Sequence, residues 1–124
     1  AAAGIRFAAP AIPYISNTTG RFARHIDAAA WGAHLRACVR FADGIAEIAR
    51  SGPAVFVEIG PGETLSKLAA ASAGRDHRFV ASLPGPNDDR SPVRTTLEAF
   101  GACWSAGEAW CITSHTITRS AWPS

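Results

Sequence analysis

The sequence predicts an α/β fold, because segments with strand character alternate with segments of helical periodicity. Residues 55–59 are mostly β-branched or aromatic, which is typical of a buried strand. Residues 78–83 have a similar character, and residues 63–73 between them predict a helix. An alternation of this kind favours helices layered on a sheet.

The N-terminal half predicts one short strand followed by two helices. Residues 12–16 are apolar and end at the turn-forming residues 17–20, so a short strand should lead into a polar loop. Asp27 is placed to cap a helix over residues 28–37. A second helix, over residues 41–50, has one apolar face formed by Phe41, Ile45, Ile48 and Ala49.

A glycine-rich turn is expected between the strand at 55–59 and the helix at 63–73. Gly60, Pro61 and Gly62 form this turn, and Gly74 ends the helix that follows. Helical spacing predicts that the inward side chains of this helix are Leu65, Leu68 and Ala69.

The last predicted helix has an apolar stripe. Ser91 and Pro92 are typical of a helix start, and Gly107 ends the helix. The stripe consists of Val93, Leu97, Phe100 and Trp104, and the tail beyond it adds Trp110. We expect Leu97, Phe100, Trp104 and Trp110 to form an interface, although packing of the stripe on the chain's own sheet is an open alternative.

Composition excludes several classes of protein. Hydrophobic residues make up 48% and charged residues 18% of the 124 residues, which is typical of a globular chain. The net charge is only +2 with no basic block, so nucleic-acid binding is not indicated. The apolar stretches are too short to span a membrane. Three cysteines without a C-x-x-C spacing favour free thiols, and we expect a cytoplasmic location.

The chain is expected to be a piece of a longer protein. Only three strands are predicted, and the first has no helix before it. So few strands with so many apolar faces would make a poor independent domain. The sequence also opens on Ala1 and contains no Met.

The glycine turn superficially resembles a nucleotide-binding site. The dinucleotide fingerprint needs a third glycine where Leu65 stands, so a plain strand-to-helix turn is favoured. Glu58 lies at the carboxyl end of the strand, where α/β proteins often place functional side chains. A structural hydrogen-bond acceptor is the favoured interpretation for Glu58, with the functional one left open.

No catalytic or metal-binding group is predicted from the residues alone. The four histidines show no metal-ligand spacing with one another, with cysteines or with carboxylates. No Gly-x-Ser-x-Gly nucleophile elbow occurs in the chain.

Three segments resemble motifs of type I polyketide-synthase acyltransferases. Residues 12–20, IPYISNTTG, are similar to the family's P-x-x-S-N-x-T-G segment. Residues 31–45, WGAHLRACVRFADGI, are similar to W-x-x-H-x-R-x-x-V-R-F-x-D-G, and residues 55–68, VFVEIGPGETLSKL, to F-x-E-x-G-P-x-x-x-L. Residues 97–110 resemble the linker that follows this domain. The motifs occur in the family's order and spacing.

The resemblance implies a fold and an activity. The fold would be the C-terminal portion of an α/β-hydrolase-like acyltransferase domain, followed by a linker with a helix and an extended tail. The complete domain would move a malonyl-type unit from coenzyme A to the phosphopantetheine thiol of an acyl carrier protein. A serine is acylated with help from a histidine, and both would lie upstream of this chain.

The resemblance also assigns supporting roles and a division of the chain. The backbone carbonyl of Arg40 would orient the catalytic histidine, and Asn17 would lie on a loop near the mouth of the site. Residues 1–76 would belong to the acyltransferase domain and residues 77–124 to the linker. This chain would bind no cofactor itself. Its expected partners are the rest of the acyltransferase domain, the ketosynthase and linker domain, and the carrier protein.

A non-catalytic interpretation competes with the enzymatic one. The same chain could be a docking module that packs on a ketosynthase, since the apolar stripe would serve that role equally well. A small nucleotide-binding protein is the third interpretation, and the broken glycine pattern argues against it.

Overall fold

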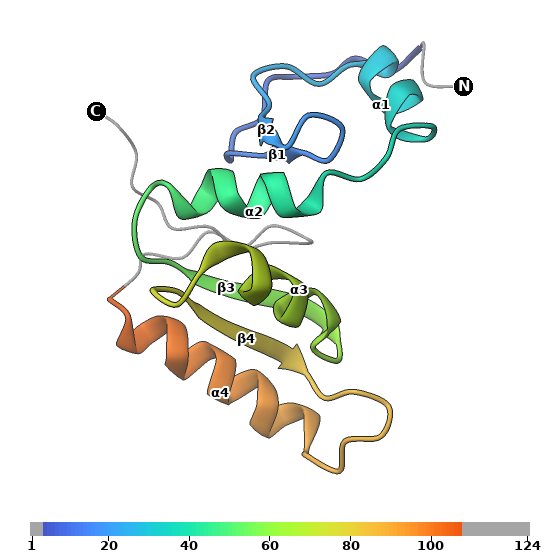
Figure 1. Cartoon of the computed structure of the whole chain (residues 1–124). Helices are drawn as coiled ribbons and strands as arrows, with labels where there is room; N and C mark the ends of the chain where they lie inside the picture. The colour runs from blue at the N-terminus through green and yellow to red at the C-terminus, as the bar shows by residue number, and fades with distance from the viewer. Residues whose placement is uncertain (1–3, 108–124) are drawn as a thin grey trace.

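The structure, a computed structural model, describes residues 4–107 and has the predicted α/β class (Figure 1). In chain order the elements are β1 (Ile15–Ser16), β2 (Arg21–Phe22), α1 (Ala28–His34), α2 (Phe41–Ala49), β3 (Val55–Pro61), α3 (Thr64–Ala73), β4 (Arg78–Leu83) and α4 (Pro92–Ser105).

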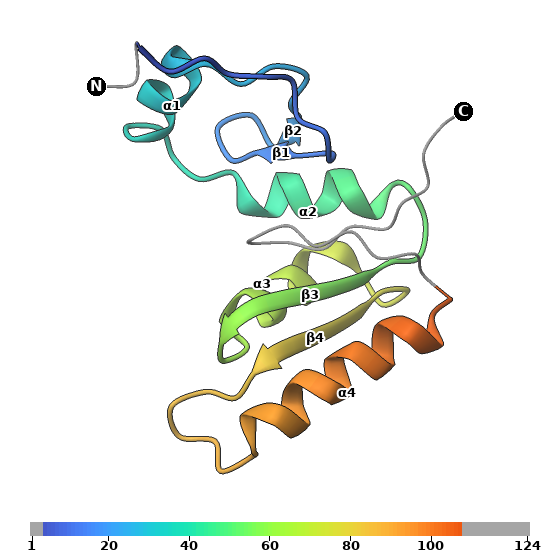
Figure 2. The same cartoon turned by 180° about the vertical axis from the view of Figure 1, so that it is seen from behind.

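A parallel pair of strands, β3 and β4, forms the centre of the fold. Val55 lies opposite Arg78 and Glu58 opposite Ala81, with an irregularity before Pro61. Figure 2 shows the two strands side by side, with α4 running along β4. β3 belongs to the segment 1–76 and β4 to the segment 77–124 of the expected division, so one sheet contains a strand from each segment.

Helices cover both faces of this sheet because side chains alternate along β3. On one face Phe56 packs with Ile45 and Ile48 of α2 and with Ala69 of α3. On the other face a second buried cluster is formed by Val55, Val57 and Val80 with Cys103 of α4. Phe41 packs against the first cluster as well, so the predicted apolar face of α2 is confirmed at Phe41, Ile45 and Ile48.

The N-terminal region lies on the side of α2 that faces away from the sheet (Figure 1). β1 and β2 form a small antiparallel hairpin in which Ile15 pairs with Phe22. The sequence predicted the first strand and its polar loop but not β2. Asp27 caps α1 as predicted, because its Oδ1 accepts a hydrogen bond from the Ala30 amide at 2.7 Å.

The expected inward face of α3 is wrong in part. Ala69 is buried as predicted, but Leu65 and Leu68 are 44% and 53% exposed. Leu68 lies about 100° around the helix from Ala69, and Leu65 belongs to the first turn. Small side chains, Ala69 and the half-buried Ala73, therefore make the contact with the sheet.

Glu58 holds the start of α3 against the end of β3. Its two carboxylate oxygens accept hydrogen bonds from the amides of Leu65, at 3.2 Å, and Ser66, at 2.8 Å. These are amides of the first helical turn, which have no partner within the helix. Glu63, the residue before the helix, makes no side-chain cap of its own. Glu58 thus acts as a hydrogen-bond acceptor for the helix, the favoured of its two interpretations.

Replacing Glu58 should reveal the strength of this cap. Glu58→Gln keeps the shape but loses the charge and one acceptor, so the free energy of unfolding should fall by about 1–2 kcal/mol. Glu63→Gln is the matched control, because Glu63 forms only exposed ion pairs with Arg90 and Lys67 and should cost at most about 0.5 kcal/mol. Urea unfolding measures both, and equal losses would contradict the capping role.

Candidate functional site at the start of helix α2

The structure brings together the two residues to which the family resemblance assigned a supporting role. The backbone amide of Arg40 donates a hydrogen bond to the backbone carbonyl of Asn17 at 2.8 Å. Arg40 is the residue before the first turn of α2, and Asn17 opens the loop of the β1–β2 hairpin. The loop therefore fixes the peptide at which α2 begins.

The remaining groups of Arg40 are also held. Its carbonyl accepts the first bond of the helix, from the Gly44 amide at 3.1 Å. Its Nε donates to Oδ2 of Asp43 at 2.7 Å, so the guanidinium lies along the first turn of α2. A carbonyl oxygen has two lone pairs, and the second one of Arg40 retains the capacity to accept a further hydrogen bond.

Internal hydrogen bonds give the hairpin loop a defined shape. The Ser16 and Thr18 hydroxyls are 2.8 Å apart, and the Thr18 amide donates to Ser16 Oγ at 3.3 Å. The Gly20 amide donates to the Ser16 carbonyl at 2.8 Å, and the Ala23 amide to the Tyr14 carbonyl at 2.8 Å. Side chains of this type commonly stabilise turns by bonding to nearby backbone groups.

Two glycines allow the hairpin to approach α2 closely. Gly20 has a φ of +66°, and a Cβ built on it would lie 2.5 Å from the Cβ of Asp43. A Cβ on Gly44 would lie 2.8 Å from Cγ2 of Ile15. Contacts below 3 Å require the neighbours to move, so the backbone approach depends on both missing side chains.

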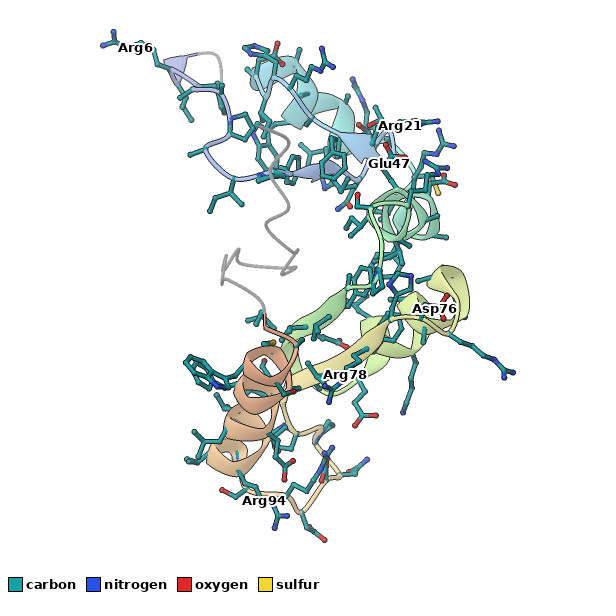
Figure 3. All side chains as sticks on the ribbon, turned by 90° about the vertical axis from the view of Figure 1, so that its left-hand side faces the viewer. Arg6, Arg21, Glu47, Asp76, Arg78 and Arg94 are labelled. Carbon is teal, nitrogen blue, oxygen red and sulfur yellow. The ribbon has the colours of Figure 1, made fainter. Side chains whose placement is uncertain are left out.

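An ion pair spans the same contact farther along α2. Arg21 of β2 points toward Glu47, with Nη1 and Oε2 3.4 Å apart (Figure 3). Glu47 also pairs with Arg50. Arg21 is well exposed, so this pair adds little free energy compared with the close packing at Gly20 and Gly44.

The glycine turn lies at the carboxyl end of β3. β3 continues to Pro61, so the chain turns later than residue 60, where the sequence placed the turn. The Gly60 amide donates to Ser82 Oγ and the Gly62 amide to the Leu83 carbonyl, both at 3.3 Å. Gly62 has a φ of +92°, which favours glycine at this position.

The apolar stripe of α4 faces away from the sheet. Leu97, Phe100 and Trp104 are 63%, 53% and 71% exposed. The face of α4 that contacts the sheet consists of Thr95, Ala99, Ala102 and Cys103. Packing of the stripe on the chain's own sheet, the open alternative, is therefore wrong within the described residues. Trp110 lies outside the described residues.

An open cleft of about 430 Å³ lies between α3, β4 and α4, and each of its charged side chains has a hydrogen-bond or ion-pair partner. Glu63 pairs with Arg90 at 3.0 Å, and the hydrogen bonds from Arg90 lower the pKa of Asp88. Within residues 4–107 no group of His, Cys, Asp and Glu side chains could hold a metal ion. None of the helices in that range has the length and apolar character that crossing a bilayer requires.

The sequence alone missed the two close approaches at Gly20 and Gly44. A signal did exist, because Gly44 interrupts an otherwise regular apolar helix. A glycine inside a helix costs stability unless a neighbour needs the space.

Known proteins with similar sequences are polyketide synthases. The chain is 36% identical over 110 residues to a phenolphthiocerol synthesis polyketide synthase of Mycobacterium marinum, covering 86% of this chain and 5% of the relative. It is 44% identical over 108 residues to the mycoketide-CoA synthase of Mycobacterium tuberculosis, covering 86% and 3%. No protein-family profile matches the chain.

Similar solved structures are acyltransferase domains. The acyltransferase domain from the second module of the salinomycin polyketide synthase is 34% identical with a TM-score of 0.76, covering 84% of this chain and 24% of that one. The acyltransferase domain of SpnD is 40% identical with a TM-score of 0.69, covering 80% and 25%. The resemblance inferred from the sequence is confirmed: the chain corresponds to part of a polyketide-synthase acyltransferase domain.

Alanine substitutions at two helical glycines distinguish the steric cost of a close contact from the gain in helix propensity. Gly44→Ala should destabilise the fold by about 1 kcal/mol or more, because the new methyl group meets Ile15. Gly101→Ala in α4 is the matched control, since nothing lies within 4 Å of its Cβ position. Alanine there should stabilise by up to about 1 kcal/mol. Thermal melts measure both, and equal stabilisation would refute a tight hairpin contact.

Proposed function

We propose that the chain supports an acyltransferase that moves a malonyl-type unit from coenzyme A to an acyl carrier protein. The observation that carries the proposal is the similarity, in sequence and fold, to solved polyketide-synthase acyltransferase domains. The SpnD domain was solved in complex with a 2-(pent-4-yn-1-yl)malonyl group, an acyl unit of the proposed class.

The contribution of this chain would be positional, with the reacting groups supplied from elsewhere. The sequence has no Gly-x-Ser-x-Gly elbow, so the acylated serine and its histidine would come from another part of the parent domain. By resemblance, the Arg40 carbonyl would accept a hydrogen bond from that histidine. An imidazole oriented in this way takes the serine proton as the acyl group transfers.

The geometry supports a role for the Arg40 backbone in preference to its side chain. The Arg40 amide is bound by the Asn17 carbonyl and the guanidinium is turned toward Asp43. These two interactions hold the carbonyl at the first turn of α2, where its second lone pair can accept a further hydrogen bond. Small displacements of a positioning group can cost about two orders of magnitude in rate.

The exposed stripe of α4 favours the docking module as a second candidate function. Its four apolar side chains are each more than half exposed: Val93, Leu97, Phe100 and Trp104. Aromatic side chains in such a patch commonly anchor interfaces. A linker that packs on a ketosynthase would cover this stripe, whether or not the parent domain is active.

Acyl loading tests the proposal. The parent domain, meaning the longer protein that contains this chain, should gain one malonyl-type adduct by intact-mass spectrometry after incubation with malonyl-CoA or a substituted malonyl-CoA. The 124-residue chain should gain none, because its nucleophile is missing. A parent domain that folds but never gains an adduct would contradict the enzymatic proposal and favour the docking function. A stoichiometric adduct on the 124-residue chain would refute the inference that the nucleophile lies elsewhere.

Two substitutions at Arg40 separate backbone from side chain. Arg40→Ala keeps the amide and should load within a few-fold of the unmodified parent domain. Arg40→Pro removes the donor to Asn17 and should slow loading by about tenfold or more while the melting temperature stays within a few degrees. The reverse order of effects would show that the guanidinium acts instead.

A further inference from the structure

The outer edge of β4 has no partner strand within the described part of the chain, where β3 and β4 form a sheet of two strands. The Arg78 amide donates a hydrogen bond to the Ala54 carbonyl at 3.0 Å and so faces β3. The N–H and C=O groups of successive strand residues point to alternate sides, so Phe79 and Ala81 direct theirs to the outer edge. Each of these two residues offers one donor and one acceptor with which a further strand could pair.

This edge lies along the open cleft of about 430 Å³ between α3, β4 and α4. Four consecutive strand residues, 78–81, line the cleft. Since consecutive side chains point to opposite faces of a strand, a cleft that meets all four residues also meets the edge of the strand. Four small side chains line the cleft: Ala70, Ala81, Ala99 and Ala102. The cleft therefore provides space beside the hydrogen-bonding groups of the edge.

Two polar side chains in the cleft can form further interactions. Ser66 Oγ of α3 is buried and has no hydrogen-bond partner among the described residues. A buried hydroxyl without a partner is costly, which points to a group that binds it. Arg78 donates to the Ser105 hydroxyl at 3.2 Å but forms no ion pair within residues 4–107 (Figure 3).

Arg78 is therefore the charged residue of the cleft that lacks a partner of opposite charge among residues 4–107. The other charged side chains that line the cleft all form ion pairs: Glu63, Lys67, Arg90 and Glu98. A carboxylate in the occupant would complete the pairing of charges.

The handedness of crossovers argues against the chain that follows α4 as the occupant. α3 and α4 cover opposite faces of the sheet. If a strand followed α4 directly and paired in parallel with the outer edge of β4, the crossovers through α3 and α4 would have opposite hands. One of them would then be left-handed, whereas about 98% of such crossovers are right-handed. A segment of another polypeptide is the favoured occupant.

We propose that the outer edge of β4 binds an extended, acidic peptide segment from outside the parent domain. The segment adds as a third strand, its backbone pairs with Phe79 and Ala81, and one of its carboxylates lies beside Arg78. Ser66 Oγ supplies a further hydrogen bond from the wall of the cleft. In recognition of this kind the backbone bonds provide affinity and the side-chain contacts provide specificity. The proposal does not depend on acyl transfer.

Hydrogen exchange in the parent domain, measured by NMR, tests strand addition at single amides. The probe is the acetylated and amidated peptide TVTEVTT, in which β-branched residues surround one glutamate. In millimolar excess it should slow exchange at the Phe79 and Ala81 amides by about fivefold or more, because both gain a backbone hydrogen bond. The Val80 amide, which faces β3, is the internal control and should not change. Unchanged exchange at Phe79 and Ala81 would overturn the proposal.

Two other occupants give different outcomes in the same experiment. If the Phe79 and Ala81 amides exchange as slowly as the Val80 amide before peptide is added, the parent domain covers this edge itself. If their exchange slows only at high protein concentration, the edge pairs with a second copy. Either outcome overturns the proposal.

An edge proline distinguishes backbone pairing from contact with the helices. Ala81→Pro removes an N–H that faces away from β3, a position at which edge strands tolerate proline, so the melting temperature should stay within a few degrees. Binding of the peptide should weaken by about fivefold or more. A peptide N-methylated at alternate residues makes the same test on the unmodified domain, so the result does not depend on how the variant folds. Undiminished binding in either case would contradict strand addition.

A charge substitution tests the carboxylate beside Arg78. Arg78→Gln should weaken binding of the glutamate peptide by about threefold and leave binding of the control peptide TVTQVTT unchanged. Arg75→Gln is the matched control, because Arg75 is exposed and forms no ion pair within residues 4–107. Equal effects of Arg78→Gln on the two peptides, or equal effects of the two variants on the glutamate peptide, would refute the acidic character of the segment.

Discussion

The hydrogen bond from the Arg40 amide to the Asn17 carbonyl is the contact on which the arrangement of the N-terminal half depends. It joins the loop of a two-residue hairpin to the first peptide of α2. So small a hairpin would be marginal by itself, and the close approaches at Gly20 and Gly44 hold it against the helix. Through Ile45 and Ile48 the same helix packs on Phe56 of the sheet, so the position of the loop is transmitted to the core.

Local sequence signals predicted the elements better than their packing. The strand at Val55, the Asp27 cap and the apolar face of α2 depend on neighbours in sequence, and the structure contains all three. The orientation of α3 depends on how closely small side chains let it approach the sheet, which periodicity does not reveal. β2 was missed because two residues have no periodicity, and their pairing depends on the hairpin turn.

In the candidate site too, individual residues were predicted but their contacts were not. The resemblance pointed to Asn17 and Arg40 separately, and only the fold shows that their backbones are bonded to each other. The role of Gly20 could not be read from its position in a polar turn, since the reason for it is the Cβ of Asp43 more than twenty residues later. Backbone contacts of this kind leave little trace in residue type beyond the glycines that permit them.

In the proposed function the chain is a supporting part, and it carries an exposed apolar stripe on α4. Hydrogen exchange at the Arg40 amide in the parent domain tests this account most directly. If the hairpin fixes the start of α2, this amide should exchange nearly as slowly as the amides within α2, and Gly20→Ala should accelerate it by about tenfold or more. An Arg40 amide that exchanges as fast as an unstructured one, with or without the substitution, would contradict the account.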